Sequence, residues 1–179
     1  MRLSIPDEQC KLIYQIKSLI MKILIATDGS EYSKEAMGEF ADMQFMLNAE
    51  VLIVSAFENS SLITSTASPM GGLAGYYEEA DSAARKAAEN AVEKAAALLK
   101  NKKLSLSITT AVGNGSPKHI ILNEAEKFNA DLIVVGSHGH GIIGRFLLGS
   151  VSQSVALHAA CSVLIIRKRD SKNEKNTQT

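Results

Sequence analysis

The sequence is poor in the features that mark several large classes of protein. It contains no tryptophan, 3 prolines and only 2 cysteines among 179 residues. Cys10 and Cys161 lie far apart and match no zinc-binding spacing, so a disulfide framework or a zinc module is excluded. Because Cys161 opens an apolar run, we expect a buried free thiol there, and a reducing, cytoplasmic setting for the protein.

An excess of charge of one sign and a long apolar run are also lacking. Lys plus Arg and Asp plus Glu number 19 each, so the overall charge favours neither nucleic acid nor a membrane as a partner. No apolar run approaches the roughly 20 residues that cross a bilayer. With 46% apolar and 21% charged residues, the composition is that of one globular domain.

The two ends of the chain differ in composition from its middle. The first 20 residues carry acidic side chains and no small-residue cleavage site, which is unlike a signal peptide. A second methionine, Met21, precedes the first strand-like run, so we expect one domain over residues 21–168. Residues 1–20 would be an N-terminal extension or a mis-assigned start, and the polar residues 169–179 a disordered tail.

Apolar runs and helical periodicity alternate along the middle of the chain. Strands are expected at residues 22–27, 50–57, 104–112, 131–136 and 162–168. Helices are expected at residues 36–47, 76–100, 116–128 and 150–160, with Ser116 as an N-cap before Pro117. Residues 59–75, which are rich in Ser, Thr and Gly, are expected to form a long loop. Five strands interleaved with four helices predict an α/β domain with an open, five-stranded parallel sheet and helices on both faces.

A ligand of such a sheet is expected beyond the carboxyl ends of the strands. The stretch GSHGHGIIGRFLLGS, Gly136 to Ser150, follows the fourth predicted strand and fits three phosphate-binding patterns. Residues 139–144 match the dinucleotide fingerprint, but they start four residues past the strand, and the next strand ends without the required acid. Residues 144–150 match a P-loop that lacks its lysine.

The outer residues of this stretch, Gly136, Gly139, Gly149 and Ser150, meet the requirements of anion binding best, and we call them the outer glycine frame. Gly136 and Gly139 let the backbone approach an anion without hindrance from a Cβ atom. Gly149 and Ser150 open a helix whose unpaired N–H groups and positive dipole end favour a phosphate. From the residues alone, a glycine-rich turn and a capped helix without any ligand remain the alternative.

The chain from about Met21 to Lys168 resembles a universal stress protein domain. The resemblance rests on ILIATDGSEYS, on ADLIVVGSHGHG, on the frame G-x2-G-x9-G-[ST] over Gly136 to Ser150, and on the ending HAACSVLIIRK. Members that carry this frame bind ATP and members that lack it do not, so the resemblance places the chain with the ATP binders. It also implies the adenine nucleotide alpha-hydrolase-like fold, with strand order 3-2-1-4-5.

The resemblance further implies which residues form the nucleotide site. Asp28 would accept a ribose hydroxyl, Ala56 would meet adenine through its backbone groups, and the residues around Gly136 and Ser150 would hold ribose and phosphates. The predicted site comprises Ala26, Thr27, Asp28, Ala56, Val135, Gly136, Ser137, His138, Gly139, Gly149, Ser150, Val151 and Ser152.

The expected function is that of an ATP-binding, nucleotide-dependent sensor or regulator of the stress response. By resemblance it is a homodimer that joins through residues 162–168, a sheet edge with unpaired backbone groups. ATP with Mg²⁺ is the expected ligand, and AMP and cAMP remain alternatives because a site for adenine, ribose and one phosphate suits them too. Neither a nucleic acid nor a membrane is expected as a partner, and the sequence identifies no protein partner.

The sequence offers little support for dedicated catalysis. No nucleophile–base pair is evident, and no second acid accompanies Asp28. His138 and His140 lack a third ligand for a metal site, so loop histidines beside a phosphate are favoured. Slow ATP hydrolysis, or transfer of phosphate or adenylate, remains the alternative activity.

Overall fold

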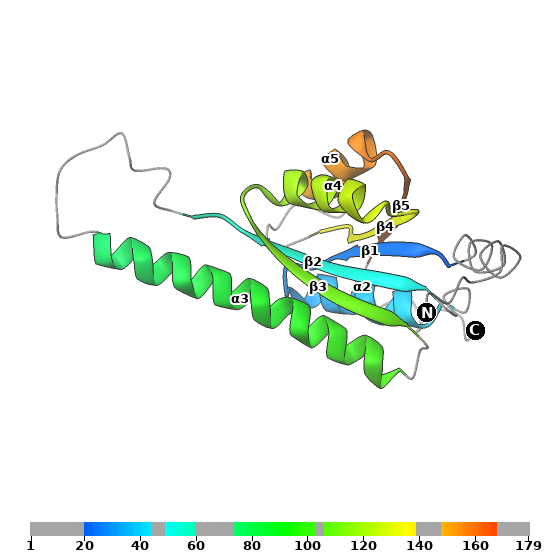
Figure 1. Ribbon diagram of the computed structural model, residues 1–179, viewed down its shortest axis with the longest axis horizontal. Coiled ribbons are helices and arrows are strands. Elements are labelled where there is room, and N and C mark those ends of the chain that lie inside the picture. The colour runs from blue at the N-terminus through cyan, green and yellow to red at the C-terminus, as the bar shows by residue number, and fades with distance from the viewer. Residues whose placement is uncertain (1–19, 44–48, 60–73, 103–105, 139–147, 168–179) are drawn as a thin grey trace, which may run out of the picture.

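The computed structural model describes residues 20–43, 49–59, 74–102, 106–138 and 148–167 (Figure 1). Five strands form a sheet in the order β3-β2-β1-β4-β5, and all four pairings between neighbours are parallel, as predicted. The strands are β1 (Lys22–Ala26), β2 (Glu50–Phe57), β3 (Ser107–Asn114), β4 (Leu132–Gly136) and β5 (Ser162–Ile166). The helices are α2 (Glu31–Ala41), α3 (Ala74–Asn101), α4 (Pro117–Phe128) and α5 (Ser150–His158).

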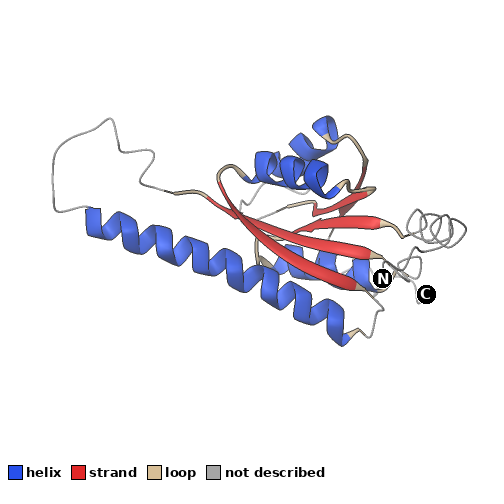
Figure 2. Cartoon of the chain, in the orientation of Figure 1, coloured by secondary structure: helices blue, strands red, loops and turns tan. Residues whose placement is uncertain are grey.

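Helices cover both faces of the sheet, as the apolar strands require (Figure 2). On one face, Ile23 of β1 packs in a cluster with Phe40 of α2 and Leu99 of α3, and all three side chains are fully buried. On the other face, Leu24 of β1 packs in a second cluster with residues of α4 and α5, including Val155. The two clusters on either side of β1 make this strand the centre of the core.

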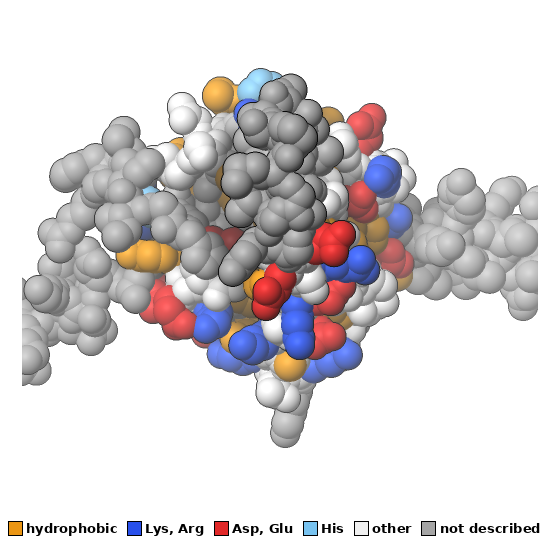
Figure 3. Space-filling model, turned by 90° about the vertical axis from the view of Figure 1, so that its left-hand side faces the viewer, with side chains coloured by type: hydrophobic (Ala, Val, Ile, Leu, Met, Phe, Trp, Pro, Cys, Tyr) orange, Lys and Arg blue, Asp and Glu red, His pale blue; other side chains and the backbone are white. Residues whose placement is uncertain are grey.

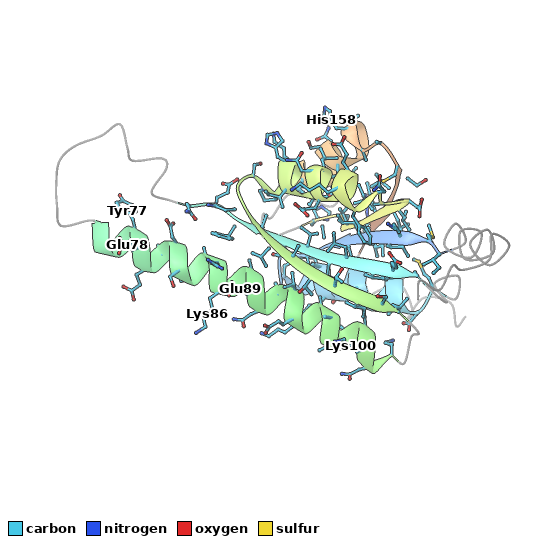
Figure 4. The ribbon with its side chains drawn as sticks, in the orientation of Figure 1. Tyr77, Glu78, Lys86, Glu89, Lys100 and His158 are labelled. Atoms are coloured by element: carbon cyan, nitrogen blue, oxygen red, sulfur yellow. The ribbon has the colours of Figure 1, made fainter. Side chains whose placement is uncertain are left out.

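The long helix α3 extends at its N-terminal end past the sheet (Figure 1). Its C-terminal half is anchored through buried residues such as Val92 and Leu99. In the N-terminal half, charged side chains face solvent, and Lys86 points away from the sheet (Figure 4). The described side chains in Figure 3 include acids and bases intermixed, in keeping with the balanced composition.

The predicted strands and helices are all present, but several of them begin or end at other residues than predicted; α3, for example, begins at Ala74 and not at residue 76. α2 begins at Glu31, before the first apolar residue of the helical pattern, because Ser30 caps it and accepts a hydrogen bond from the Ser33 N–H at 3.2 Å. β3 begins at Ser107 and not at residue 104. Ser116 holds the N-cap position of α4 as predicted, but its side chain makes no capping hydrogen bond.

Cys161 is partly buried, packed against the cluster that contains Leu24, and carries a free thiol. Burial and the neighbouring Asp131 carboxylate both raise the pKa of the Cys161 thiol. None of the described helices has the length and apolar character needed to cross a membrane. Cys10, the residues 60–73 of the predicted loop and the predicted tail lie outside the described residues.

Candidate functional site

A cavity of about 470 Å³ lies at the carboxyl ends of β1, β2 and β4, with α3, α4 and α5 around it. This is the place where strand order reverses in the sheet, because β1 continues the chain to β2 on one side and pairs with β4 on the other. Of the predicted site residues, the cavity is lined by Ala26, Thr27, Asp28, Ala56, Val135, Gly136, His138, Gly149, Ser150, Val151 and Ser152. Ser137 is buried and is not among the lining residues, and Gly139 lies outside the described residues.

β2 extends further toward the cavity than its neighbour β1, so part of the β2 backbone has no partner on the β1 side among the described residues. β1 ends at Ala26, opposite Val54, while β2 continues to Phe57 and pairs there with β3 alone. The Val54 carbonyl accepts from the Thr27 N–H at 2.9 Å, so it points toward β1, and the Phe57 carbonyl accepts from the Gly115 N–H at 2.8 Å on the opposite side. Because successive residues of a strand alternate in direction, the N–H and C=O of Ala56 point to the β1 side, beyond the end of β1. Ala56 therefore presents one donor and one acceptor to the cavity.

Hydroxyl groups hold the turn between β1 and α2. Asp28 Oδ1 accepts hydrogen bonds from the N–H of Ser30 at 3.0 Å and from its Oγ at 2.6 Å. Thr27 Oγ1 accepts from the Gly29 N–H at 3.2 Å and lies 3.1 Å from Ser33 Oγ. Gly29 has φ of +75°, a conformation that favours glycine. The turn thus fixes Asp28 at the rim of the cavity with its carboxylate exposed.

Two hydrogen bonds join the start of α5 to the end of β4. Ser152 Oγ donates to the Gly136 carbonyl at 2.6 Å, and the Gly149 N–H donates to the Ser137 carbonyl at 2.8 Å. A Cβ atom on Gly149 would come within 3.3 Å of that same carbonyl oxygen, so a larger residue would press on this contact. The hydroxyl hydrogen of Ser152, a residue of the predicted nucleotide site, is therefore engaged within the protein.

The N-terminus of α5 presents backbone donors to the cavity. Gly149, the N-cap residue, has no side chain to accept a capping hydrogen bond. The first N–H groups of a helix also lack partners within the helix, and the helix dipole makes this end positive. Ser150 and Val151 line the cavity at this point. The arrangement suits an anion, in agreement with the outer glycine frame.

Two helices supply cavity walls that the sequence analysis did not identify. α3 contributes Ala84, Ala87 and Ala88, and α4 contributes Pro117 and Ile121. The sequence predicted a helix in this part of the chain, but the pattern of alanines along α3 cannot show which turns pack on the sheet and which pass the cavity. The remaining lining residues that were not predicted are Ser33, Val54, Ser55 and Phe57.

One further histidine lies away from the cavity, and two further side chains of possible interest lie outside the described part of the chain. His158 lies at the end of α5, on the outside of the molecule (Figure 4), where its Nδ1 is 2.8 Å from the Ser154 carbonyl. His140 and Arg145 lie outside the described residues. Within the described ranges, no group of three or more His, Cys, Asp and Glu side chains could hold a metal ion.

The family model of the universal stress protein family matches residues 20–167. This chain belongs to the universal stress protein family. Universal stress protein YxiE of Bacillus subtilis (strain 168) is 32% identical to this member over 151 residues, which cover 82% of this chain and 98% of YxiE. Family membership, predicted from the sequence motifs, is thereby confirmed.

Solved structures of universal stress proteins share the fold. UspA from Lactobacillus plantarum superposes with a TM-score of 0.67 at 26% identity, covering 82% of this chain and 97% of UspA. A universal stress protein solved in complex with cAMP superposes with a TM-score of 0.57 at 25% identity, covering 83% of this chain and 97% of that protein. These similarities confirm the predicted α/β fold of the adenine nucleotide alpha-hydrolase type.

Proposed function

We propose that this universal stress protein binds ATP in the cavity between β1, β2 and β4 and acts as a nucleotide-dependent sensor or regulator. The observation that carries the proposal is that one cavity of about 470 Å³ joins a free backbone edge to an uncapped helix N-terminus. The backbone edge at Ala56 suits a base, and the N-terminus of α5 suits phosphates. A related universal stress protein has been solved with cAMP, which supports an adenine nucleotide as the ligand class.

The residues that line the cavity fit both the base and the sugar of such a ligand. Adenine offers an N–H donor next to a ring-nitrogen acceptor, which complements the acceptor and donor of Ala56. The apolar side chains of Ala84 and Ile121, on α3 and α4, line the cavity and suit the faces of a flat ring. Asp28, at the rim, is a carboxylate acceptor for a ribose hydroxyl.

The phosphates would lie against Gly136, Gly149 and the start of α5; Gly139, the remaining glycine of the predicted site, lies outside the described residues. Mg²⁺ would accompany ATP on its phosphate oxygens, because the described residues alone form no metal site. AMP and cAMP remain alternative ligands, since they present the same base, sugar and first phosphate. Slow ATP hydrolysis, or transfer of phosphate or adenylate, remains the alternative activity.

Calorimetry of the full chain with ATP and Mg²⁺, AMP and cAMP tests the proposal. Saturable binding of ATP is expected, and no heat of binding at high micromolar ATP would refute the proposed function. Nucleotide recovered from the protein after hours of incubation separates a sensor from an enzyme: intact ATP supports the sensor, whereas accumulated ADP, AMP or pyrophosphate supports the alternative.

Two further parts of the proposal concern assembly and setting. β5 lies at the edge of the sheet, and its residues Val163 and Leu164 are only partly buried, so residues 162–168 are proposed as the contact of a homodimer. Light scattering of the purified chain is expected to give twice the 19.2 kDa mass of one chain. A cytoplasmic setting stays a prediction that rests on the cysteine content. One domain over residues 21–168 stays a prediction that rests on the sequence pattern.

A further inference from the structure

One ring nitrogen in the site is buried without a hydrogen-bond partner. Nε2 of His138 contacts no donor or acceptor in the structure as described, although the histidine lines the cavity. The other ring nitrogen, Nδ1, lies 2.9 Å from Ser137 Oγ. Buried polar atoms of native proteins are nearly always hydrogen-bonded, so an unpaired one at a cavity points to a ligand atom.

The hydrogen bond to Ser137 indicates what kind of atom Nε2 needs. Ser137 is 3% exposed, and Nδ1 of His138 is the partner that the structure gives its hydroxyl. A buried hydroxyl hydrogen requires an acceptor, so Ser137 donates and Nδ1 accepts. The proton of the neutral imidazole then lies on Nε2, which makes Nε2 a donor that seeks an acceptor oxygen.

The position of His138 places this donor at the proposed phosphate end. A Cβ atom on Gly149 would lie 3.6 Å from the Cα of His138, so the histidine stands directly against the N-cap of α5. Its ring also contacts the ring of Tyr32, with 6.1 Å between centroids at an interplanar angle of 48°. Ser137 and Tyr32 thus support the imidazole from two sides, which limits its rotation.

We propose that the imidazole of His138 donates a hydrogen bond from Nε2 to a phosphate oxygen of the bound nucleotide and so discriminates phosphorylated ligands from the free nucleoside. This inference rests on the proposed adenine nucleotide function. It adds a side-chain contact to a phosphate site otherwise made of backbone N–H groups. His138 is then a specificity-determining residue, because adenosine has no oxygen at that position.

Two substitutions separate this role from a packing role. In His138→Gln the side-chain amide nitrogen takes the place of Nε2, and in His138→Asn the side-chain amide takes the place of Nδ1. The measurement is the affinity of the full chain for adenosine, AMP and ATP by calorimetry, with a thermal melt of each variant to verify folding. The quantity of interest is the ratio of AMP affinity to adenosine affinity.

We expect His138→Asn to lower this ratio by about tenfold or more, because a hydrogen bond to a charged group is lost. His138→Gln is expected to retain most of the ratio. The inference is overturned if both variants keep the ratio of the native protein, or if His138→Asn keeps it and His138→Gln loses it. If the native protein binds neither nucleotide nor nucleoside, the proposed function fails first and this inference with it.

A spectroscopic measurement tests the same contact without any substitution in the protein under study. In ¹⁵N-histidine-labelled protein, the Nε2 signal of His138, assigned by its absence in His138→Gln, is expected to shift on addition of AMP. Adenosine should leave it in place. An equal shift with both ligands would overturn the proposed contact with phosphate.

Discussion

The hydroxyl of Ser152 donates a hydrogen bond to the carbonyl of Gly136 at 2.6 Å, across 16 positions of sequence. The Ser152 side chain is buried, with 4% of the residue exposed. The hydrogen bond fixes the start of α5 against the end of β4, the two elements between which the glycine frame spans. The geometry of the proposed phosphate site therefore depends on an interaction inside the protein.

Removal of this bond should affect both stability and binding. Ser152→Ala leaves the Gly136 carbonyl without its donor, and the free energy of unfolding should fall by about 1–2 kcal/mol, as measured by urea denaturation. ATP affinity should fall with it, because α5 is less firmly placed. Gln153→Ala, at the next and exposed position of α5, is the control and should change neither quantity.

A side chain at position 149 should abolish the proposed phosphate contact. In Gly149→Val the new Cβ would lie 3.3 Å from the Ser137 carbonyl oxygen and 3.6 Å from the Cα of His138, so the start of α5 must move. We expect ATP binding by calorimetry to weaken by at least about tenfold, with a folded far-UV circular dichroism spectrum.

Gly38→Ala provides the matched control for this substitution. A Cβ atom at Gly38 on α2 meets nothing within 4 Å, so the change should stabilise the helix by roughly 0.5–1 kcal/mol and leave ATP binding unaltered. Normal ATP binding by Gly149→Val would show that the phosphate has been assigned to the wrong place.

A larger side chain on the cavity-facing side of α3 should weaken ATP binding, whereas one on the exposed side should not. Ala84 lines the cavity, whereas Ala83, the preceding residue, is exposed on the helix surface. Ala84→Leu places three more carbons in the cavity, and ATP affinity should fall by about tenfold or more, since overpacking costs roughly 1–3 kcal/mol. Ala83→Leu, which has the same helix propensity change, should bind as the native protein does. Equal affinities for both variants would exclude α3 from the ligand site.

The thiol of Cys161 should react slowly at neutral pH. Burial, and then the Asp131 carboxylate, raise its pKa, so the thiolate fraction at pH 7 is lower than for a free cysteine. In a Cys10→Ser background, the rate of alkylation by iodoacetamide should rise with pH along a curve displaced to higher pH than that of a model thiol. Asp131→Asn removes the negative charge and should displace the curve to lower pH. A curve that coincides with the model thiol would contradict the raised pKa.

The fold was predictable because a strand that is buried on both faces of the sheet appears in the sequence as a continuous apolar run. β2 has the predicted bounds, Glu50–Phe57, because its apolar run ends where the core ends. The start of α2 was missed because its first turn is polar and is set by the Ser30 cap, which apolar periodicity does not register.

The site was predictable in its backbone parts and not in its side-chain parts. Gly136 and Gly149 mark close approaches, where a Cβ atom would lie 3.3 Å from a backbone oxygen, so their spacing can be recognised in the sequence. The hydrogen bond of Ser152 to Gly136, by contrast, is a tertiary contact that no local pattern encodes. The same is true of the α3 wall, since a surface of alanines looks alike whether it meets a sheet or a ligand.

Because β1 ends at Ala26 and β2 continues to Phe57, the sequence at position 56 is free to vary in a particular way. A base that lies beside Ala56, beyond the end of β1, would take the place of a further β1 residue in the sheet. It would then be recognised by the backbone N–H and C=O of Ala56 and not by a side chain. Position 56 could then change its side chain without changing the preferred base. What must be preserved is the pairing of β2 with β3 at this height, where Ala56 lies opposite Gly113 and a Cβ on that glycine would come within 2.5 Å of Ile120. A larger residue at position 113, one strand away from the cavity, would then act on base binding indirectly, by displacing the Ile120 side chain or β3.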